Sequence, residues 1–235
     1  MLKKISLLLL ILCAGFTGNA QTPKMNPSSE QFLKVLRMPG TGDTWGKMSG
    51  KVYHRRKGAD PVEAPISFRT LLSSRTTIGQ LIFREKEICQ LTQSRVEPFS
   101  SSVETNGPST LEDMGIRPSD LVMNFIYWKF LGELPRETIR MQECRILVFE
   151  SPDTKEKVKV FVNASHIFPV RVQWLGKEDS KPYRTLEVNG LKKVGDLWVV
   201  EELAVSGPGW KSRIHFNQLD AGYTKHGIPT DLFAE

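Results

Sequence analysis

The residue types that most often carry chemistry are present in this sequence, but their spacing assembles no catalytic or metal site. The four histidines are His54, His166, His215 and His226, and none stands at a metal-ligand spacing. His54 and His215 are expected on the polar, solvent-facing side of strands. No glycine-flanked serine follows a strand as a hydrolase nucleophile would, and no glycine-rich loop could cradle a phosphate. We therefore expect a protein that is not an enzyme, with no catalytic residue, metal or cofactor.

Glu201 and Glu202 are the adjacent carboxylates that general acid–base catalysis would suggest. Consecutive residues of a strand point to opposite faces, so this pair could not act together on one substrate. A lipid esterase remains the weakest functional hypothesis, and a serine-directed covalent probe would test it.

Cys89 and Cys144 are the two cysteines that would remain after export. In an oxidising compartment a pair with one possible connectivity is a reasonable disulfide. The bridge would close a long loop and stabilise the fold by about 4 kcal/mol on the chain-entropy estimate. Two buried thiols on separate strands are an equally weighted alternative.

The first twenty residues have the form of a secretory signal peptide. Lys3 and Lys4 precede an apolar run over residues 5–13, and small residues follow up to Ala20. The run is too short to span a bilayer. We predict cleavage after Ala20, a periplasmic location, and one mature domain over residues 21–235.

The charge of the chain is mildly basic, with 32 lysines and arginines against 26 acidic residues. The basic residues alternate with apolar ones along expected strands and do not cluster with aromatic residues. Nucleic-acid binding therefore has little support, and no nucleic-acid partner is expected.

Most of the mature chain has the period-two alternation of half-buried antiparallel strands. Short turn-forming stretches separate these runs, so strands that follow one another in sequence are expected to pair in a meander. The expected strands cover residues 47–56, 66–73, 78–85, 86–93, 96–104, 133–141, 143–150, 158–162, 168–174, 183–193, 197–205 and 210–217.

Two segments predict helices. Residues 28–37 have an amphipathic pattern, with Phe32, Val35 and Leu36 on one face. Residues 118–131 are apolar nearly all round, with Ser119 as the expected N-cap. A helix of that kind must be covered on most sides, so the sheet is expected to curve around it.

The large apolar residues of this expected helix and of three strands all fall on inward-facing positions. Periodicity alone favours an ordinary close-packed core for such residues. A curved sheet of many strands, however, encloses more volume than one helix fills, and large aromatic residues often line apolar ligand sites. Both readings stay open at this point.

Three blocks resemble the outer-membrane lipoprotein-sorting proteins of the LolA-like superfamily. They are the run 117–121, the Phe125-Ile126-Tyr127-Trp128 segment, and the Glu143-Cys144-Arg145-Ile146-Leu147 strand, followed in order by Gly195-Asp196-Leu197-Trp198. The resemblance implies an α+β fold, with a strongly curved antiparallel sheet of about eleven strands that forms an unclosed barrel. Helices would cap this barrel, and its apolar cavity would bind acyl chains.

We therefore expect a non-catalytic periplasmic carrier of lipid or lipoprotein acyl chains, with transient membrane contact and an inner-membrane transporter complex as a further partner. The alternative is a structural or protein-interaction module of an envelope assembly with a filled core. The residues expected to line the lipid site are Leu121, Phe125, Ile126, Trp128, Val170, Val172, Trp174, Trp210, Ile214 and Phe216.

Overall fold

The structure is a computed structural model, and it describes residues 6–8, 27–38, 42–176 and 181–233. The predicted cleavage site after Ala20 lies outside the described residues. Within the predicted signal peptide only β1 (Ser6–Leu8) is described, and it pairs in parallel with residues 197–199. None of the helices in the described part of the chain is long and apolar enough to cross a membrane.

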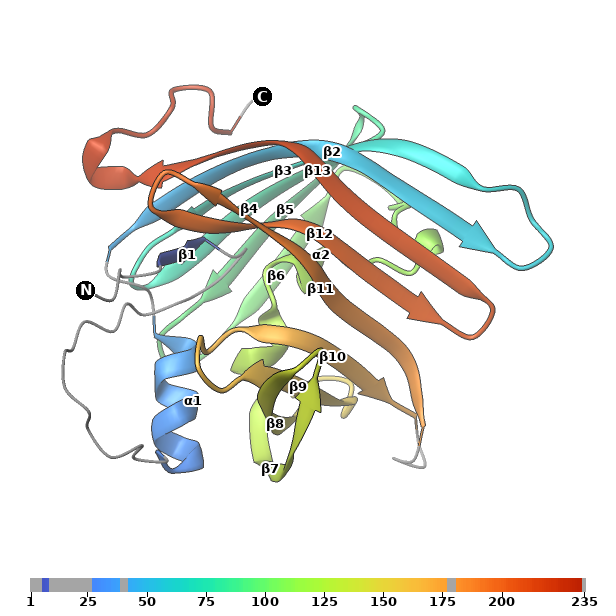
Figure 1. Ribbon diagram of the computed structural model, residues 1–235. Helices are drawn as coiled ribbons and strands as arrows, with labels where there is room; N and C mark the ends of the chain where they lie inside the picture. Colours follow the sequence, from blue (N-terminus) through green and yellow to red (C-terminus); the bar gives the residue numbers. More distant parts are fainter. Residues whose placement is uncertain (1–5, 9–26, 39–41, 177–180, 234–235) are drawn as a thin grey trace.

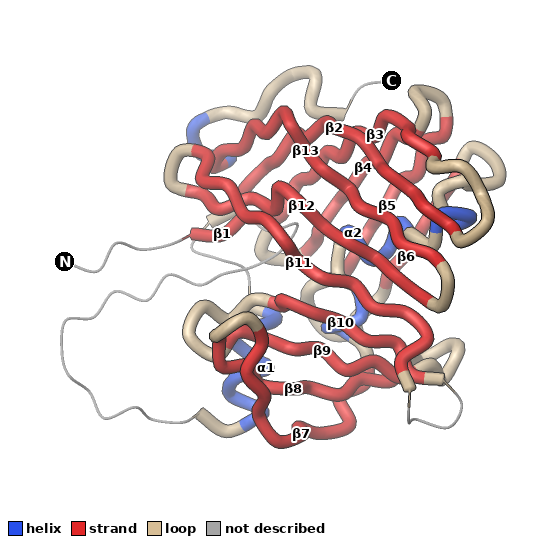
Figure 2. Tube along the Cα trace, turned by 45° about the vertical axis from the view of Figure 1, so that its right-hand side comes forward, coloured by secondary structure: helices blue, strands red, loops and turns tan. Residues whose placement is uncertain are grey.

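Twelve antiparallel strands form one curved sheet in the order β6-β5-β4-β3-β2-β13-β12-β11-β10-β9-β8-β7 (Figures 1 and 2). Their bounds are β2 Thr44–Arg56, β3 Val62–Leu72, β4 Thr76–Phe83, β5 Glu87–Ser94, β6 Ser101–Thr105, β7 Lys129–Ile139, β8 Gln142–Glu150, β9 Lys157–Asn163, β10 Pro169–Leu175, β11 Pro182–Val194, β12 Leu197–Gly207 and β13 Trp210–Tyr223.

This order confirms the predicted meander, because from β2 onward consecutive strands pair everywhere except between β6 and β7. These two strands are the ends of the order, so the sheet is open, as predicted. The count differs slightly, with twelve strands on the path in place of about eleven. The helices are fewer and shorter than we expected for an α+β fold, and the described chain is mostly β.

The first predicted helix is confirmed as α1 (Ser29–Arg37). Ser28 is its N-cap and forms a capping box with Gln31. Phe32, Leu33 and Leu36 are buried, whereas Val35, expected on the buried face, is only half-buried. Figures 1 and 2 both place α1 beside the β7–β10 part of the sheet.

The second predicted helix is wrong as a continuous element. Its residues form α2 (Pro118–Leu121), the 3₁₀ turn η2 (Asn124–Tyr127) and, from residue 129, the start of β7. Met123, between α2 and η2, has a left-handed backbone with φ of 48°. The N-cap is Arg117 and not Ser119, because Pro118 takes the first helical position, where its missing N–H costs nothing. Residues 118–127 are nevertheless largely buried inside the curve of the sheet, as their composition predicts, whereas Lys129 and Leu131 are exposed.

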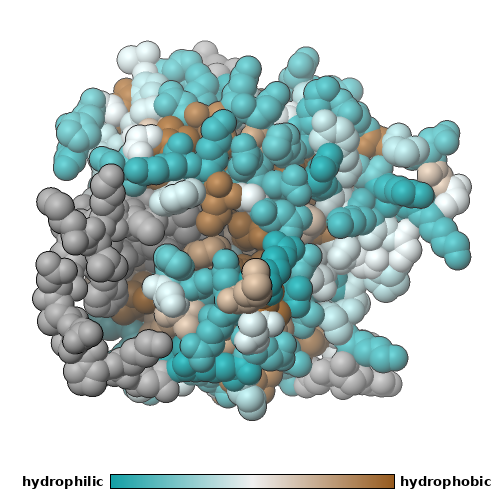
Figure 3. All heavy atoms as spheres, in the orientation of Figure 1, coloured by the Kyte–Doolittle hydropathy of each residue, from teal (hydrophilic) through white to brown (hydrophobic). Residues whose placement is uncertain are grey.

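One large hydrophobic cluster joins α1, residues 111–127 and the inner face of most strands. A second, small cluster on the opposite face of β8 and β9 contains Ile139, Cys144, Ile146 and Phe161. Hydrophilic side chains cover most of the face drawn in Figure 3, and hydrophobic ones gather near its centre. The apolar surface of the sheet is therefore largely directed inward.

The expected disulfide between Cys89 and Cys144 is not formed, and both cysteines are free and buried. Cys89 lies on β5 in the large cluster, whereas Cys144 lies on β8 in the small one. The two strands are each second from an opposite end of the sheet. The alternative, two buried thiols on separate strands, is confirmed, and burial raises the pKa of each thiol.

Candidate functional site

The ten residues predicted to line a lipid site all belong to, or pack against, the large hydrophobic cluster. Trp128, Val170 and Trp210 are partly buried at its margin. The other seven are buried: Leu121, Phe125, Ile126, Val172, Trp174, Ile214 and Phe216. Phe125 and Trp174 meet edge to face with ring centroids 5.7 Å apart. The structure thus brings the predicted residues together in one apolar interior.

Trp210 covers one margin of this interior. Its indole lies against Gly115 and Gly207, and a Cβ atom placed on Gly115 would stand 2.2 Å from the ring. Gly115 also has a φ of 73°, which favours glycine. Trp210 is therefore a closing side chain at the margin, next to His54 at 6.4 Å between ring centroids.

The N-terminal end of α1 is held by a buried charge pair. Glu133 on β7 accepts hydrogen bonds from the Ser29 hydroxyl at 2.6 Å and from Arg145 Nε at 2.7 Å. Arg145 also donates to the Pro27 carbonyl and lies 4.3 Å from the centroid of the Phe32 ring. Its guanidinium lowers the pKa of Glu133. These contacts fix α1 to the edge strand of the open sheet.

The C-terminal end of α1 is held by Arg37. This side chain donates to the carbonyl oxygens of Ile126 at 2.7 Å and Trp128 at 2.8 Å. Its guanidinium also lies 4.8 Å from the ring centroid of Phe99. Burial lowers the pKa of Arg37. One side chain thus connects α1 to the backbone of η2 beneath it.

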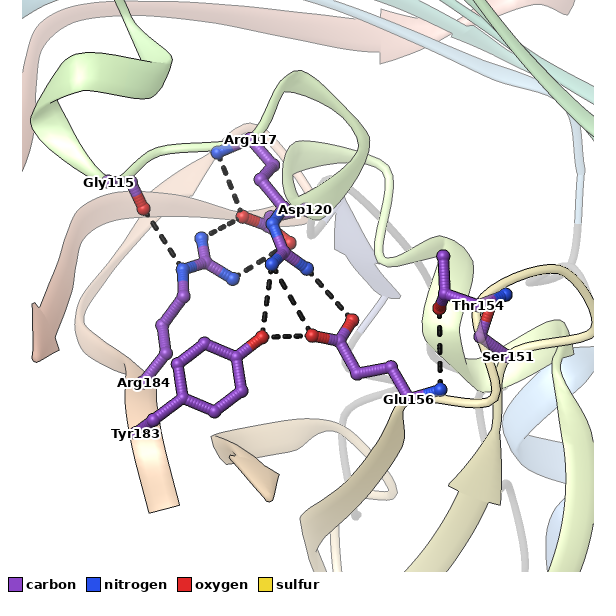
Figure 4. A network of polar contacts seen from close by, with 8 residues as sticks. All are labelled: Gly115, Arg117, Asp120, Ser151, Thr154, Glu156, Tyr183 and Arg184. Carbon is purple, nitrogen blue, oxygen red and sulfur yellow. Dashed lines mark hydrogen bonds and ion pairs between the residues drawn. The ribbon is translucent and has the colours of Figure 1, made fainter. Parts of the chain in front are cut away.

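A polar network holds the segment that fills the interior (Figure 4). Asp120 of α2 forms an ion pair with Arg184 of β11, and both are almost fully buried. Arg184 Nε also donates to the Gly115 carbonyl at 3.0 Å, and its guanidinium lies 4.1 Å from the Trp174 ring centroid. Beside them, Arg117 pairs with Glu156 at 2.9 Å. The interior segment is therefore fixed by charge as well as by packing.

A pocket of about 390 Å³ lies between α1 and the chain that follows β5, and we call it the α1 pocket. Arg37 and Arg95 are its buried or partly buried cations. Its lining consists of Glu30, Leu33, Lys34, Arg37, Met38, Ser74, Arg95, Val96, Glu97 and Phe99. Sequence reasoning missed this pocket. Arg95 continues the parity of the inward-facing Cys89, Leu91 and Gln93, and that signal was available.

The nearest approach to a nucleophilic pair is between His54 and Ser212. His54 Nδ1 lies 2.8 Å from Ser212 Oγ, and the Ser212 hydroxyl donates to the Met114 carbonyl. Ser212 is fully buried, so its oxygen cannot reach a substrate. His54 is also buried, contrary to the expected solvent-facing position, because its strand packs under Trp210 and residues 113–114.

No protein-family model matches the sequence, and no curated protein does. Solved structures do match. A domain named as an outer membrane lipoprotein-sorting protein from Vibrio parahaemolyticus is 17% identical with a TM-score of 0.63, over 86% of this chain and 93% of that one. A LolA superfamily protein from Nitrosomonas europaea is 10% identical with a TM-score of 0.58, over 88% and 97%.

A DUF1329 family protein from Desulfovibrio piger is 13% identical with a TM-score of 0.56, over 81% of this chain and 91% of that one. At such low identities the likeness shows the fold. The resemblance read from the sequence is confirmed at that level, and the chain has a LolA-like fold.

Proposed function

We propose that this protein is an exported, non-catalytic binder or carrier of lipid or lipoprotein acyl chains in the bacterial envelope. The observation that carries the proposal is the apolar interior of the open sheet. The helix α1 covers this interior, and a small number of polar contacts at the two ends of α1 hold the helix in place. The domain from Vibrio parahaemolyticus with the same fold is named for lipoprotein sorting, which supports this function and a periplasmic location.

The physical argument rests on α1. Its Phe32, Leu33 and Leu36 lie in the large cluster, while its polar tethers are concentrated at Glu133 and Arg37. Release of α1 would expose apolar side chains of the helix and of the interior to water. An acyl chain that took the place of water there would gain about 0.8 kcal/mol for each buried methylene group, before ordering costs.

The test is binding of an apolar fluorescent probe, N-phenylnaphthylamine, and its displacement by a twelve-carbon lipid. We expect probe fluorescence to rise on binding and tryptophan emission to shift, because Trp128 and Trp174 border the interior. Native mass spectrometry of protein purified from its own envelope should show bound lipid. The absence of both a fluorescence change and co-purifying lipid would overturn the proposal.

Arg37→Leu sharpens this test, because it removes both hydrogen bonds from α1 to η2. The variant should take up the probe several-fold faster than the wild type. Lys34→Leu is the matched control, since Lys34 is an exposed cation on the same helix. Equal rates for the wild type and Arg37→Leu would show that α1 does not gate the interior.

The second candidate is a structural or protein-interaction module with a filled core. The burial of seven of the ten predicted lining residues favours it, because a close-packed core buries such residues without any ligand. A stable protein partner on pull-down, together with no probe binding, would support this alternative. An inner-membrane transporter complex as partner of a carrier remains a prediction.

A further inference from the structure

The α1 pocket contains a buried guanidinium that no described carboxylate neutralises. Arg95 follows β5, lines the pocket and is only 5% exposed. Its Nε and Nη2 atoms have no hydrogen-bond partner among the described residues. Buried charges in proteins are almost always paired or bound to a ligand. The packing of the protein alone therefore does not account for Arg95.

Tyr127 places a second unsatisfied donor near Arg95. Its hydroxyl is buried beside Arg95, whose guanidinium can donate to the phenol oxygen, and its own proton has no acceptor among the described residues. Burial raises the pKa of Tyr127, and the positive charges of Arg95 and Arg37 oppose that rise. The Tyr127 ring lies 5.4 Å from that of Phe99, on which Arg37 stacks. Two guanidinium groups of the pocket lining thus lie near one phenol, which contacts the pocket residue Phe99.

The inner face of the sheet is polar at the end of β5 that leads to Arg95. Gln93 precedes Arg95 by two residues and stands opposite Thr77 on β4. Thr70 on β3 lies one diagonal step further. The side-chain oxygens Gln93 Oε1, Thr77 Oγ1 and Thr70 Oγ1 are all buried without a partner. Such atoms are rare in native proteins, and here several of them share one face of the sheet.

The charges around the pocket favour an anion at its floor. Glu30, Lys34 and Glu97 line the pocket but are exposed, so water and salt screen them. Arg95 and Arg37 are the cations withdrawn from water. Arg37 gives its hydrogen bonds to two carbonyl groups, and the carboxylate whose charge acts on it is that of the exposed Glu97. An oxyanion would supply both the negative charge and the acceptor atoms that this floor lacks.

The floor is also continuous with the apolar interior. Leu33 lines the pocket and belongs to the large hydrophobic cluster, and Phe99 lines the pocket and packs against that cluster. We propose that the α1 pocket binds the oxyanion head group of an acyl lipid, a phosphate or a carboxylate, whose chain enters the interior beneath α1. This inference rests on the proposed acyl-chain function and names the class of lipid that the protein selects.

The experiment compares two twelve-carbon ligands on the full chain, dodecyl phosphate and the neutral glycerol monolaurate, each below its micelle concentration. Displacement of N-phenylnaphthylamine gives both dissociation constants. We expect dodecyl phosphate to bind at least about tenfold more tightly than glycerol monolaurate, which is the effect of one charge-assisted hydrogen bond. Inorganic phosphate should compete at least about a hundredfold more weakly than dodecyl phosphate, because it lacks the chain.

Arg95→Met should remove this preference and leave binding of glycerol monolaurate unchanged. Arg55→Met is the matched control, since Arg55 is an exposed arginine near the end of β2 that is far from the pocket. The other end of β2, at residue 44, is the one near the pocket, because Asp43 accepts a hydrogen bond from the backbone of the pocket residue Ser74. Arg55→Met should retain the wild-type preference. The melting temperature of Arg95→Met should equal or exceed that of the wild type, because the variant loses an unpaired buried charge.

Tyr127→Phe provides a second variant that removes one hydroxyl and little volume. It should weaken dodecyl phosphate binding a few-fold and leave glycerol monolaurate unaffected. Equal affinities of the wild type for the two lipids, or a preference for dodecyl phosphate that persists in Arg95→Met, would overturn the head-group inference alone. Inorganic phosphate as strong as dodecyl phosphate would assign the site to a free anion and also overturn it. Failure of both lipids to displace the probe would instead overturn the proposed acyl-chain function.

Discussion

Asp120 and Arg184 form the most deeply buried ion pair among the described residues, with side chains 3% and 4% exposed. The pair joins α2 to β11, and Arg184 also bonds to the Gly115 carbonyl and covers Trp174. Two charges withdrawn from water give little net stability as a pair, but each depends on the other. The pair therefore fixes the interior segment in one position.

Removal of one partner should be much more costly than removal of both. Asp120→Ala leaves Arg184 buried and uncompensated, so we expect the free energy of unfolding in urea to fall by about 3–5 kcal/mol. The double variant Asp120→Leu, Arg184→Met should recover most of that loss. Lys51→Ala, which breaks an exposed pair with Glu63, should leave the free energy of unfolding nearly unchanged. A similarly unchanged stability for Asp120→Ala would contradict this account.

Thr77 provides the opposite case, a buried hydroxyl without a partner. Thr77→Val replaces it by a methyl group of similar shape on a β-branched residue. We expect the free energy of unfolding to rise by about 1 kcal/mol, because the variant no longer buries an unsatisfied hydroxyl. Thr92→Val on the exposed side of β5 is the control and should change stability by less than about 0.5 kcal/mol. Destabilisation by Thr77→Val would show that the hydroxyl has a structural partner.

At the level of elements, the alternation of strands was the part that the sequence specified well. Residues 158–162 show why: Val158, Val160 and Val162 reach the large cluster while Phe161 reaches the small one. Side-chain direction in a strand follows from the period of two residues alone, so the buried face can be predicted from the sequence without knowledge of the partner strand. α1 was predicted in a similar way, from the amphipathic pattern of Phe32, Val35 and Leu36.

The secondary structure of the interior segment was harder to predict from the sequence, because a stretch that is apolar on every side is buried in any conformation. Composition predicted its burial, but Met123 breaks the helix and composition carries no signal for that. The polar end of the inner face was missed for the opposite reason. Thr77, Gln93 and Arg95 are residue types expected to face solvent. Only parity shows that they face inward: Gln93 and Arg95 follow Cys89 and Leu91 on β5, and Thr77 precedes Leu81 and Phe83 on β4.

The tether between α1 and β7 should depend on acidity. Arg145 lowers the pKa of Glu133, so the folded protein keeps this carboxylate ionised below the ordinary pKa of 4.5. The stability that Glu133 contributes is therefore present above about pH 4.5 and is lost as the pH falls through its folded pKa. Glu133→Gln should cost about 2 kcal/mol at neutral pH, and the difference from the wild type should shrink below pH 4.5.

Thermal unfolding of both proteins across this range measures that difference. Glu143→Gln is the control, because Glu143 is largely exposed in its pair with Arg136 and its replacement should change stability little. A gap between the wild type and Glu133→Gln that stays constant down to strongly acidic pH would refute the assignment.

At the scale of the whole molecule, the pairing of β2 with β13 joins the first and last strands of the meander in the middle of the sheet. Strands from both halves of the chain thus contribute to the large cluster, together with α1 and the interior segment. One continuous hydrophobic cluster therefore connects most elements of the described chain. We therefore expect the described part of the chain to unfold as one cooperative domain.

The two buried thiols can test this expectation, since they mark nearly opposite ends of the sheet. Cys89→Ala leaves Cys144 as a reporter of the small cluster, and Cys144→Ala leaves Cys89 as a reporter of the large one. Both thiols should be unreactive in the native protein, because they are buried with raised pKa values. In urea, both thiols should become reactive at the concentration at which the β-sheet circular dichroism is lost. This comparison requires that each transition is corrected for the stability of its variant. Exposure of Cys144 at a distinctly lower urea concentration would show that β7–β9 open as a separate unit, and a single domain would then be the wrong description.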